Sequence, residues 1–399
     1  MSGPGGCADG ADAVCGFLLW AACAGSVNAG LVTLFLGGDV MLGRGVDQIL
    51  PRPCDPVIHE PFVHDARRYV ALAERLNGPI PRGVDFSYVW GDAIVELGRK
   101  APDVRIVNLE TAVTTSGDYW PNKGINYRMS PGNLPCLAAA GIDACTLANN
   151  HVLDWGYAGL HETLGALADV HIQAAGAGRD AAQAAAPLLL QTRSAGRVIL
   201  FSFGTEDSGI PLRWAAAPGR PGINLLGDLS GSTVRRITED VERVKRPGDV
   251  AVASIHWGGN WGYTIETEKK EFARRLLDQG GIDVIHGHSS HHPKGIEVCR
   301  DKPILYGCGD LLDDYEGIGG YEEFRADLVL LYFVSMEPRT GTLAGLEMVP
   351  MRVRNFRLHR ASEQEARWLA NLLDRECARL GTRVEMGADC VLTLRWGRR

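Results

Sequence analysis

Short apolar runs rich in β-branched residues recur along the chain, and most of them end in a cluster of polar side chains. Near-continuous runs of this kind are typical of strands that are buried in a sheet. The polar residues that follow them are Asp, Asn, Glu or His. The runs are Leu31–Leu36, Val104–Val107, Asp143–Leu147, Val250–Ile255, Ile282–Ile285 and Ile304–Tyr306.

Stretches with the periodicity of amphipathic helices lie between these runs. The sequence predicts helices over 64–77, 92–100, 157–169, 232–246 and 266–280. Strands that alternate with helices indicate an α/β fold built from βαβ units. Because ligands of such sheets bind beyond the carboxyl ends of the strands, we expect the polar clusters to meet at one site.

The C-terminal part follows a different pattern. Residues 327–334 and 346–353 are predicted to form two strands that extend the sheet in antiparallel fashion. A final helix is expected over 363–380, where Ser362 and Glu365 have the spacing of a capping box.

The chain contains no clear linker, so we predict a single domain over 31–399 with residues 327–380 packed on it. Residues 1–30 are interpreted as a loose extension. The segment 207–231, rich in proline and glycine, is expected to be a loop beside the site.

Composition narrows the classes of function. The net charge of −7 over 399 residues argues against a nucleic-acid-binding protein, which would carry a basic patch. The apolar segment 13–25 is too short to span a bilayer, and the first basic residue is Arg44, so the positive region of a signal peptide is missing. Ten cysteines without a CxxC pair fit reduced thiols. We therefore expect a cytoplasmic protein that does not bind membranes.

The densest chemical signal is a group of four histidines between His286 and His292, directly after a predicted strand. Imidazole is the commonest metal ligand and titrates near neutral pH. The cluster therefore indicates metal binding or proton transfer, and the alternative is a solvated surface turn. Within it, we expect His286 to point back into the sheet.

Five motifs occur in a fixed order along residues 31–335: Gly38-Asp39-x-Met41, Asn108-Leu109-Glu110, Asn149-Asn150-His151-x-x-Asp154-x-Gly156, His256-Trp257-Gly258 and Gly287-His288-x-x-His291. Together they resemble the CapA family of poly-γ-glutamate capsule biosynthesis, within the calcineurin-like metallophosphoesterase superfamily. The resemblance implies a sandwich of two mixed β-sheets flanked by helices, with the site at the sheet edges.

The resemblance also implies roles for individual residues. The residues at the positions of superfamily metal ligands are Asp39, Glu110, Asn150, His256, His288 and His291. His151 stands where the superfamily has a histidine that protonates or stabilises the reacting group. Asp154 follows it in the same motif and is expected to orient its ring, as carboxylates near metal sites do.

Three departures from the superfamily pattern fall on the ligands of a paired-metal site. Met41 replaces a histidine, Glu110 replaces a bridging aspartate, and the last motif has one extra residue before His291. A thioether does not suit a hard ion, so we expect one metal or a rearranged site. Oxygen ligands favour Ca²⁺, Mn²⁺ or Mg²⁺, and Zn²⁺ and Fe remain alternatives.

If oxygens hold the metal, the histidines are available for proton transfer. The candidate catalytic residues are His151, Asp154, His256, His291 and His292. Acid/base chemistry beside a metal suits proton removal next to a carbonyl group. The sharpest hypothesis is Cα epimerisation of a ribosomal peptide of the lasso type, with a precursor peptide as partner, since one CapA-like branch is known for it. The alternatives are a phosphoester hydrolase and a component of poly-γ-glutamate capsule biosynthesis.

A peptide or polyglutamyl substrate would need a binding surface. Trp257 and Trp261 are candidates for an aromatic wall, and Arg44 and Lys123 for contacts to a carboxylate or phosphate. Core aromatics and surface charges are the competing interpretations. The pair Asp313 and Asp314 is assigned to a solvated loop.

Overall fold

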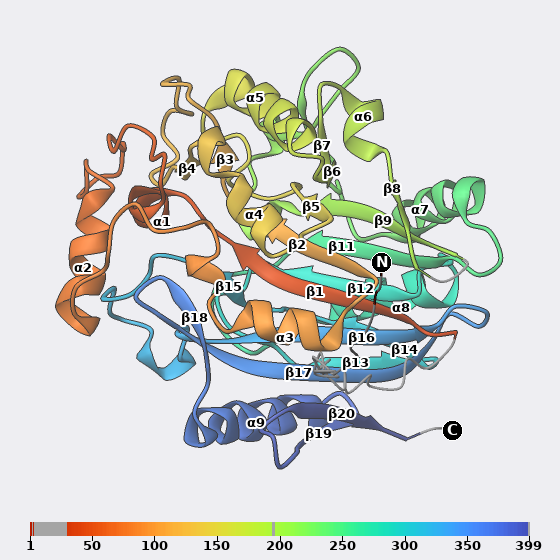
Figure 1. Cartoon of the computed structure of the whole chain (residues 1–399). Helices are drawn as coiled ribbons and strands as arrows, with labels where there is room; N and C mark the ends of the chain where they lie inside the picture. Colours follow the sequence, from red (N-terminus) through yellow and green to blue (C-terminus); the bar gives the residue numbers. More distant parts are fainter. Residues whose placement is uncertain (2, 4–29, 194–195, 398–399) are drawn as a thin grey trace.

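Two β-sheets packed face to face form the centre of the protein in a computed structural model, which describes residues 1, 3, 30–193 and 196–397 (Figure 1). The larger sheet has the order β19 (Thr382–Met386), β20 (Leu392–Trp396), β17 (Thr342–Arg354), β16 (Leu328–Glu337), β1 (Val32–Val40), β2 (Val104–Leu109), β5 (Ala144–Thr146) and β6 (Gln173–Ala175). In addition, β15 (Asp310–Leu312) pairs with β1, and β18 (Arg357–Arg360) pairs with β17.

The second sheet has the order β13 (Ile296–Cys299), β14 (Lys302–Leu305), β12 (Val284–His288), β11 (Val250–His256), β9 (Arg197–Gly204) and β8 (Leu188–Gln191). Two short pairs complete the strands, β3 (Ala112–Val113) with β4 (Arg128–Met129), and β7 (Ala177–Gly178) with β10 (Gly222–Ile223). Strands β1, β2, β5 and β6 are parallel to one another, as are β9, β11, β12 and β14. Each sheet therefore brings several carboxyl ends to one edge.

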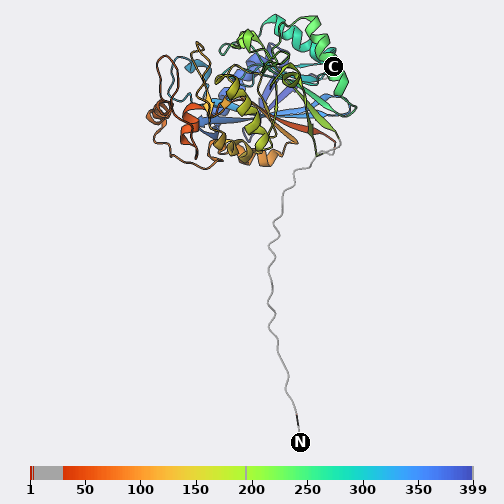
Figure 2. The same cartoon turned by 90° about the horizontal axis from the view of Figure 1, so that it is seen from above.

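Helices cover the outer faces of both sheets. They are α1 (Arg44–Ile49), α2 (Arg67–Asn77), α3 (Ala93–Lys100), α4 (Pro135–Ala139), α5 (Gly156–Asp169), α6 (Ala181–Ala185), α7 (Gly231–Val244), α8 (Thr267–Asp278) and α9 (Glu363–Ala378). In the view from above, the green and cyan helices lie on one side of the strands, and orange and yellow helices lie on the other (Figure 2).

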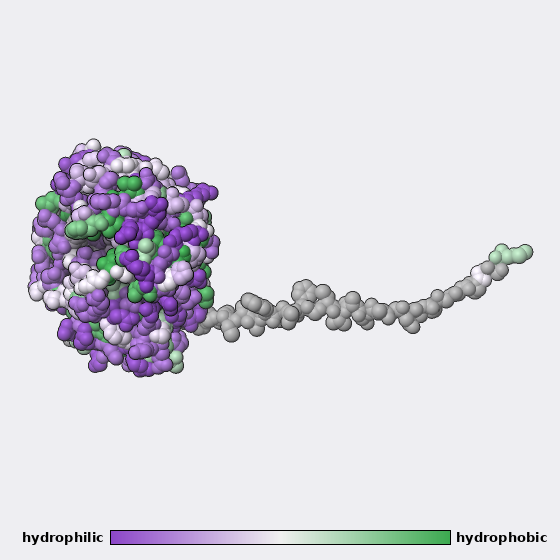
Figure 3. All heavy atoms as spheres, turned by 90° about the vertical axis from the view of Figure 1, so that its left-hand side faces the viewer, coloured by the Kyte–Doolittle hydropathy of each residue, from purple (hydrophilic) through white to green (hydrophobic). Residues whose placement is uncertain are grey.

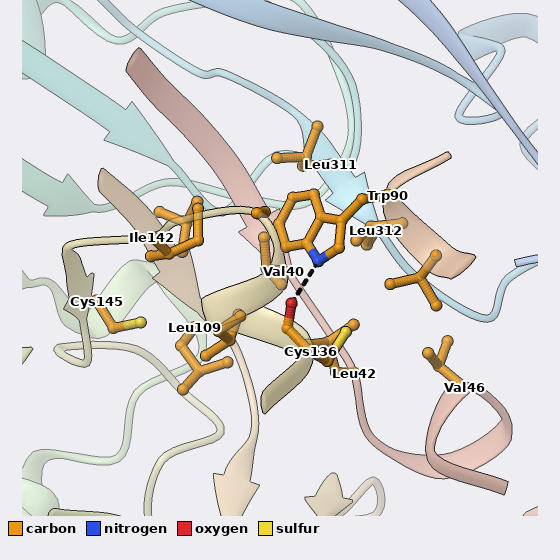
Figure 4. Close-up of a cluster of buried hydrophobic side chains, with 14 of the residues drawn as sticks. Val40, Leu42, Val46, Trp90, Leu109, Cys136, Ile142, Cys145, Leu311 and Leu312 are labelled. Carbon is orange, nitrogen blue, oxygen red and sulfur yellow. Dashed lines mark hydrogen bonds between the residues drawn. The ribbon is translucent and has the colours of Figure 1, made fainter. Parts of the chain in front are cut away.

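Three apolar cores hold these layers together. The core between the sheets joins Leu34 and Leu36 of β1 to Val252 of β11. A second core packs the outer face of the larger sheet, where the Trp90 indole donates a hydrogen bond of 2.8 Å to the Cys136 carbonyl (Figure 4). The third core packs α7 and α8 on the second sheet. Burial of this apolar surface is the main force that fixes the strand ends.

The predicted fold class is confirmed, since the chain forms a sandwich of two mixed sheets flanked by helices. All six predicted helices form, with ends within a few residues of expectation, and Ser362 and Glu365 make the predicted capping box. The antiparallel pairing of β16 with β17 is confirmed as well. Strands β8, β9, β19 and β20 were not predicted.

The extension over 1–30 lies almost entirely outside the described residues. Among the helices that the structure describes, none is long and apolar enough to cross a membrane.

Candidate active site

The carboxyl ends of strands from both sheets meet at one point. Asp39 on β1 is opposite Asn108 on β2 and opposite Asp310 on β15. In the second sheet, the last residues of β11 and β12, His256 and His288, face each other in register. The ends of β2, β15, β11 and β12 therefore lie around Asp39 at the end of β1.

A close approach of two main chains sets the position of Asp310. The Asp39 amide donates a hydrogen bond of 3.0 Å to the Gly309 carbonyl. A Cβ atom on Gly38 would overlap that same carbonyl oxygen. Glycine at position 38 therefore allows β15 to lie directly against β1 and brings the two carboxylates together.

Two groups of potential metal ligands share Asp39. The first contains Asp39, His256 and His288, and the second contains Asp39, Glu110 and Asp310. Within each group all ligand atoms lie within 4.8 Å of one another, and every member is buried. A carboxylate shared between two sets of donors is the arrangement expected where one or two divalent cations bind.

The carboxylates of this cluster are buried and repel one another when they are ionised. Burial, and then repulsion by Asp310, raises the pKa of Asp39 to about 8. Burial and the charge of Asp39 likewise raise the pKa of Glu110 well above its usual range. One oxygen of Glu110, Oε2, is buried without a hydrogen-bond partner. These residues fit a cation, because a positive ion would satisfy both the charge and the orphaned oxygen.

A row of imidazoles continues from the cluster into the second sheet. Nδ1 of His256 lies 2.8 Å from Nδ1 of His288, and Nε2 of His288 lies 2.9 Å from the Ser254 hydroxyl. The same hydroxyl lies 3.0 Å from Nδ1 of His286, whose Nε2 donates to the Gly37 carbonyl at 2.8 Å. Burial lowers the pKa of all three imidazoles. His286 does point into the sheet, and neutral His256 and His288 suit metal ligation.

His151 lies beside Glu110 at the edge of the cluster. Its Nδ1 is 2.6 Å from Oδ2 of Asp154, and its Nε2 is 4.0 Å from Glu110. Lys123 lies 2.8 Å from the other Asp154 oxygen and 3.2 Å from Nδ1 of His151. Because the contact to Asp154 is the shorter one, we assign the Nδ1 proton to it. Burial, and then Lys123, lowers the pKa of His151 to about 4, so the ring is neutral.

His291 lies on the Asp310 side of the same cluster. Its Nδ1 is 3.0 Å from both carboxylate oxygens of Asp310. Burial lowers the pKa of His291, but the charge of Asp310 and its hydrogen bond outweigh burial and raise it. The ring of Tyr315 stands edge-on to His291 at 5.2 Å, and its hydroxyl is 2.7 Å from that of Tyr127, which stacks on His151 at 3.8 Å.

A pocket of about 780 Å³ opens onto this cluster. Glu110, His151 and His291 line the pocket, as do Trp261 and Tyr321, whose rings stack at 4.0 Å. The hollow is visible in the space-filling view, with apolar and strongly hydrophilic residues around it (Figure 3). Its size suits a segment of a peptide rather than a single small ion.

The structure places several predicted site residues elsewhere. Trp257 is only 3% exposed, packs in the core under α7 and α8, and donates to the Tyr306 carbonyl at 3.0 Å, so it is removed from the substrate-binding set. His292 packs on Phe324 and Tyr263 instead of facing the pocket. The pocket keeps Trp261 and Lys123.

The charged pairs near the pocket also differ from expectation. Arg44 lines the pocket but is buried, and it makes ion pairs with Asp314 and with Glu60. Its guanidinium group is thus already used by carboxylates of the protein. Asp313 and Asp314 are buried and do not form the expected solvated loop. Arg44 and the Gly45 amide compensate the carboxylate of Asp314. The Asp313 carboxylate accepts a hydrogen bond of 2.8 Å from the Tyr315 amide.

Asp310 is the main potential metal ligand that the sequence analysis missed. It follows a recognised apolar run and a Gly-Cys-Gly turn, which was a usable signal. Asn108, Asn149, Tyr127 and Tyr315 were also missed. Asn108 donates to Asp39 at 2.7 Å, and Asn149 in turn donates to Asn108 at 3.0 Å, so both hold the cluster from behind.

A two-sheet sandwich with carboxylates and imidazoles at its strand ends defines a protein with a metallophosphoesterase-like fold. A sequence profile described as "Bacterial capsule synthesis protein PGA_cap" matches residues 33–315. The chain therefore belongs to this family, as its resemblance to CapA implied.

Individual relatives support the assignment. A protein of Mycobacterium tuberculosis named as a probable polyglutamine synthesis accessory protein is 49% identical over 366 residues, which are 92% of this chain and 96% of the relative. The PGA biosynthesis protein CapA of Bacillus subtilis is 27% identical over 263 residues, 65% of this chain and 64% of that protein. The capsule biosynthesis protein CapA of Bacillus anthracis is 22% identical over 232 residues, 58% and 53% of the two chains.

Proposed function

We propose that the protein is a metal-dependent enzyme that transfers protons on a peptide-type polymer of glutamate or glutamine units, with inversion of a Cα centre as the specific reaction. One observation carries the proposal. His151 beside Glu110 and His291 beside Asp310 flank the same cluster and line the same pocket. Two positioned imidazoles are what a two-base epimerisation requires.

The cation would be held by Asp39, Glu110, Asp310, His256 and His288, with the Asn150 amide beside them. Mn²⁺ accepts both oxygen and imidazole ligands, and for this reason we favour it over Ca²⁺ and Mg²⁺. Zn²⁺ and Fe are the alternatives for the histidine-containing group. When bound, the metal supplies positive charge that stabilises an oxyanion developing on a substrate carbonyl.

His151 is the proposed base. Asp154 fixes the proton on Nδ1, which leaves Nε2 unprotonated and directed to the side of Glu110 and the pocket. In the reaction, Nε2 takes the proton of the substrate Cα while the bonding electrons of that C–H bond move toward the carbonyl. Asp154 and Lys123 keep the ring oriented throughout.

His291 is the proposed acid. Its contact with both oxygens of Asp310 holds one nitrogen and leaves the other for the substrate. The Cα regains a proton from this imidazole on the opposite face, so one proton is removed and one is added. The enzyme returns to its starting state when His151 releases its proton to water and His291 takes one up.

The names of the relatives favour a polymer over a ribosomal peptide. Two CapA relatives and the polyglutamine accessory protein are all named for synthesis of repeating glutamyl or glutaminyl chains or of capsules. A lasso-type peptide released from a precursor is the other substrate of the same chemistry. The Trp261–Tyr321 stack in the pocket wall is suited to a peptide of either kind.

A hydrolase is the second candidate, and a specific observation favours it. Two groups of potential ligands share Asp39, just as the two metal sites of paired-metal hydrolases share a carboxylate. The departures from the superfamily pattern in the sequence had suggested less similarity to such a site. In that case His151 would protonate the leaving group of a phosphoester or of a chain segment. A purely accessory role in capsule synthesis is the third possibility.

The test is incubation of the Mn²⁺-loaded protein with oligoglutamate or oligoglutamine in D₂O. Epimerisation predicts deuterium at Cα and D-residues after acid hydrolysis, whereas hydrolysis predicts shorter chains or released phosphate from phosphoesters without Cα deuterium. His151→Gln should abolish either activity. The matched control is His161→Gln, a histidine exposed on α5. Lack of any turnover with Mn²⁺, Zn²⁺ and Fe²⁺ would leave only the accessory role.

A further inference from the structure

The hairpin of β17 and β18 has a basic face. In its register Arg352 is opposite His359, and Arg354 is opposite Arg357. Alternate residues of a strand point to opposite sides, so these four basic side chains share one face. The residues between them, including Val353 and Leu358, belong to the apolar core on the other face.

This face borders a second hollow of about 420 Å³. Its lining residues are Arg352, Arg354, Asn355, His359, Arg360, Ser362 and Glu365. Arg352 also lines the large pocket that contains His151 and His291. The two cavities therefore adjoin at Arg352, and a chain that extends from the candidate active site past this residue would reach the basic face.

The charges of the hairpin are only partly compensated. Arg352 pairs with Glu365 at 2.7 Å, and Arg360 pairs with Glu96 at 3.0 Å. Arg354 is exposed at the end of β17, and within the described part of the chain it has no ion pair. The second hollow thus presents a free guanidinium group, which is suited to carboxylates.

The turn of the hairpin is strained and is tied to the active-site pocket. Asn355 and Phe356 both have positive φ angles, 56° and 54°, as a type I′ turn requires. For a bulky residue such as Phe356 this conformation is unfavourable. Glu316, which lines the large pocket, accepts hydrogen bonds from both turn amides at 2.8 and 2.6 Å. The basic face is therefore held at a defined position relative to the pocket.

We propose that the second hollow is a distal subsite for the carboxylates of an extended polyglutamate chain whose reacting residue lies in the large pocket. The inference rests on the proposed function and narrows its substrate to the anionic polymer. The names of the relatives include both polyglutamine and PGA. Glutamine side chains have the shape of glutamate but no charge, so a free arginine discriminates between the two.

The hairpin also lies beyond residues 33–315, the stretch that the family profile matches. A subsite on β17 and β18 is therefore separate from the family motifs at the strand ends. Its removal should change chain binding and leave the chemistry at the metal cluster intact. That separation makes the subsite testable by itself.

The experiment measures binding of fluorescently labelled oligoglutamate and oligoglutamine to the Mn²⁺-loaded protein. A trimer and a dodecamer are compared, because about twelve extended residues span roughly 40 Å. Arg354→Gln should weaken binding of the long oligoglutamate about threefold, and Arg354→Glu about tenfold or more, with smaller losses at high salt. The trimer and both oligoglutamines should be unaffected. Arg339→Gln, in the turn between β16 and β17 and with its side chain 86% exposed, is the control for general charge effects.

Three results would overturn the subsite: unchanged binding of the long oligoglutamate by both Arg354 variants, equal losses for oligoglutamine, or the same loss in Arg339→Gln. The proposed function fails separately. If the long oligoglutamate binds in an Arg354-dependent manner but shows neither Cα deuterium nor cleavage, the subsite stands and the catalytic proposal does not. If the trimer is turned over while Arg354 has no effect on long chains, only the subsite is lost.

Discussion

Asp39 and Asp310 are directly opposite each other on two parallel strands, β1 and β15, and both carboxylates are buried. Two like charges in register are unfavourable unless a proton or a cation lies between them. Glu110 adds a third carboxylate to the same space. The pairing of β1 with β15 therefore requires a proton or a cation between these carboxylates.

Metal-free protein should lose stability as the pH rises from about 4 to about 8. Over this range the unfolded chain ionises Asp39 near its ordinary pKa of 3.8, whereas the folded protein retains the proton up to a pKa of about 8. A raised carboxyl pKa therefore favours folding at low pH and disfavours it at high pH. Mn²⁺ replaces the proton, so thermal unfolding should show a larger rise in Tm with Mn²⁺ at pH 8 than at pH 5.

The control for this metal effect is Asp310→Asn. It should reduce the pH dependence of the metal-free protein, because burial still raises the pKa of Asp39 but the second cause, repulsion by Asp310, is gone. It should also weaken Mn²⁺ binding in titration calorimetry. An equal Tm shift with Mn²⁺ at both pH values would contradict the assignment of these carboxylates as ligands.

Asp154→Asn should reduce kcat about 10²–10⁴-fold while the fold is retained. The asparagine side chain no longer holds the Nδ1 proton of His151 at 2.6 Å, so the base adopts the wrong tautomer or orientation. Steady-state kinetics with the active substrate measure the effect, and circular dichroism checks the fold. Asp118→Asn, an exposed position in the neighbouring loop, serves as the control and should keep full activity.

Tyr315→Phe should lower kcat more than Tyr127→Phe. The two hydroxyls share one hydrogen bond of 2.7 Å and have no other partner among the described residues, so one hydroxyl proton remains for a ligand oxygen. Tyr127 is the more deeply buried, and we assign the free proton to Tyr315. Loss of such a donor reduces rates by about 10²-fold or more.

Tyr69→Phe is the matched control for the tyrosine pair. Tyr69 lines the same pocket, but its hydroxyl already donates to Glu60. It should therefore change stability slightly and leave kcat unchanged. The assignment to Tyr315 is refuted if Tyr69→Phe and Tyr315→Phe reduce kcat equally.

Two tryptophans that look alike in the sequence should respond differently to alanine. Trp257→Ala should lower the free energy of unfolding by about 3–5 kcal/mol, because it leaves a cavity in the core and removes a hydrogen bond to Tyr306. Trp261→Ala should raise KM about threefold to tenfold through loss of its stack on Tyr321, with little change in Tm. Denaturant unfolding and kinetics separate the two, and a stable Trp257→Ala variant would show that the ring packs elsewhere.

The sequence predicted the layers of the fold well because alternating apolar runs and helical patterns are local signals. The local patterns also placed Asp39, His256 and His288 at strand ends. Their interpretation as metal ligands came from the resemblance to the CapA family. Asp310 also follows an apolar run, but it was not assigned to the site, because the short strand that carries it is defined by pairing with β1, far away in the chain. The burial of Trp257 was equally hidden, since the pattern around it does not tell which face of the loop meets α8.

The close approach at Gly38 has a consequence for how the site can change. No ligand is contributed by this residue, yet a methyl group there would act as a wedge between β1 and the Gly309 carbonyl. The distance between Asp39 and Asp310 is thus set by a contact between two backbone segments and not by side-chain packing. A substitution at position 38 would therefore separate the two halves of the cluster while leaving every potential ligand in place. Variation at this position is constrained by the geometry of the site, although the residue takes no part in its chemistry.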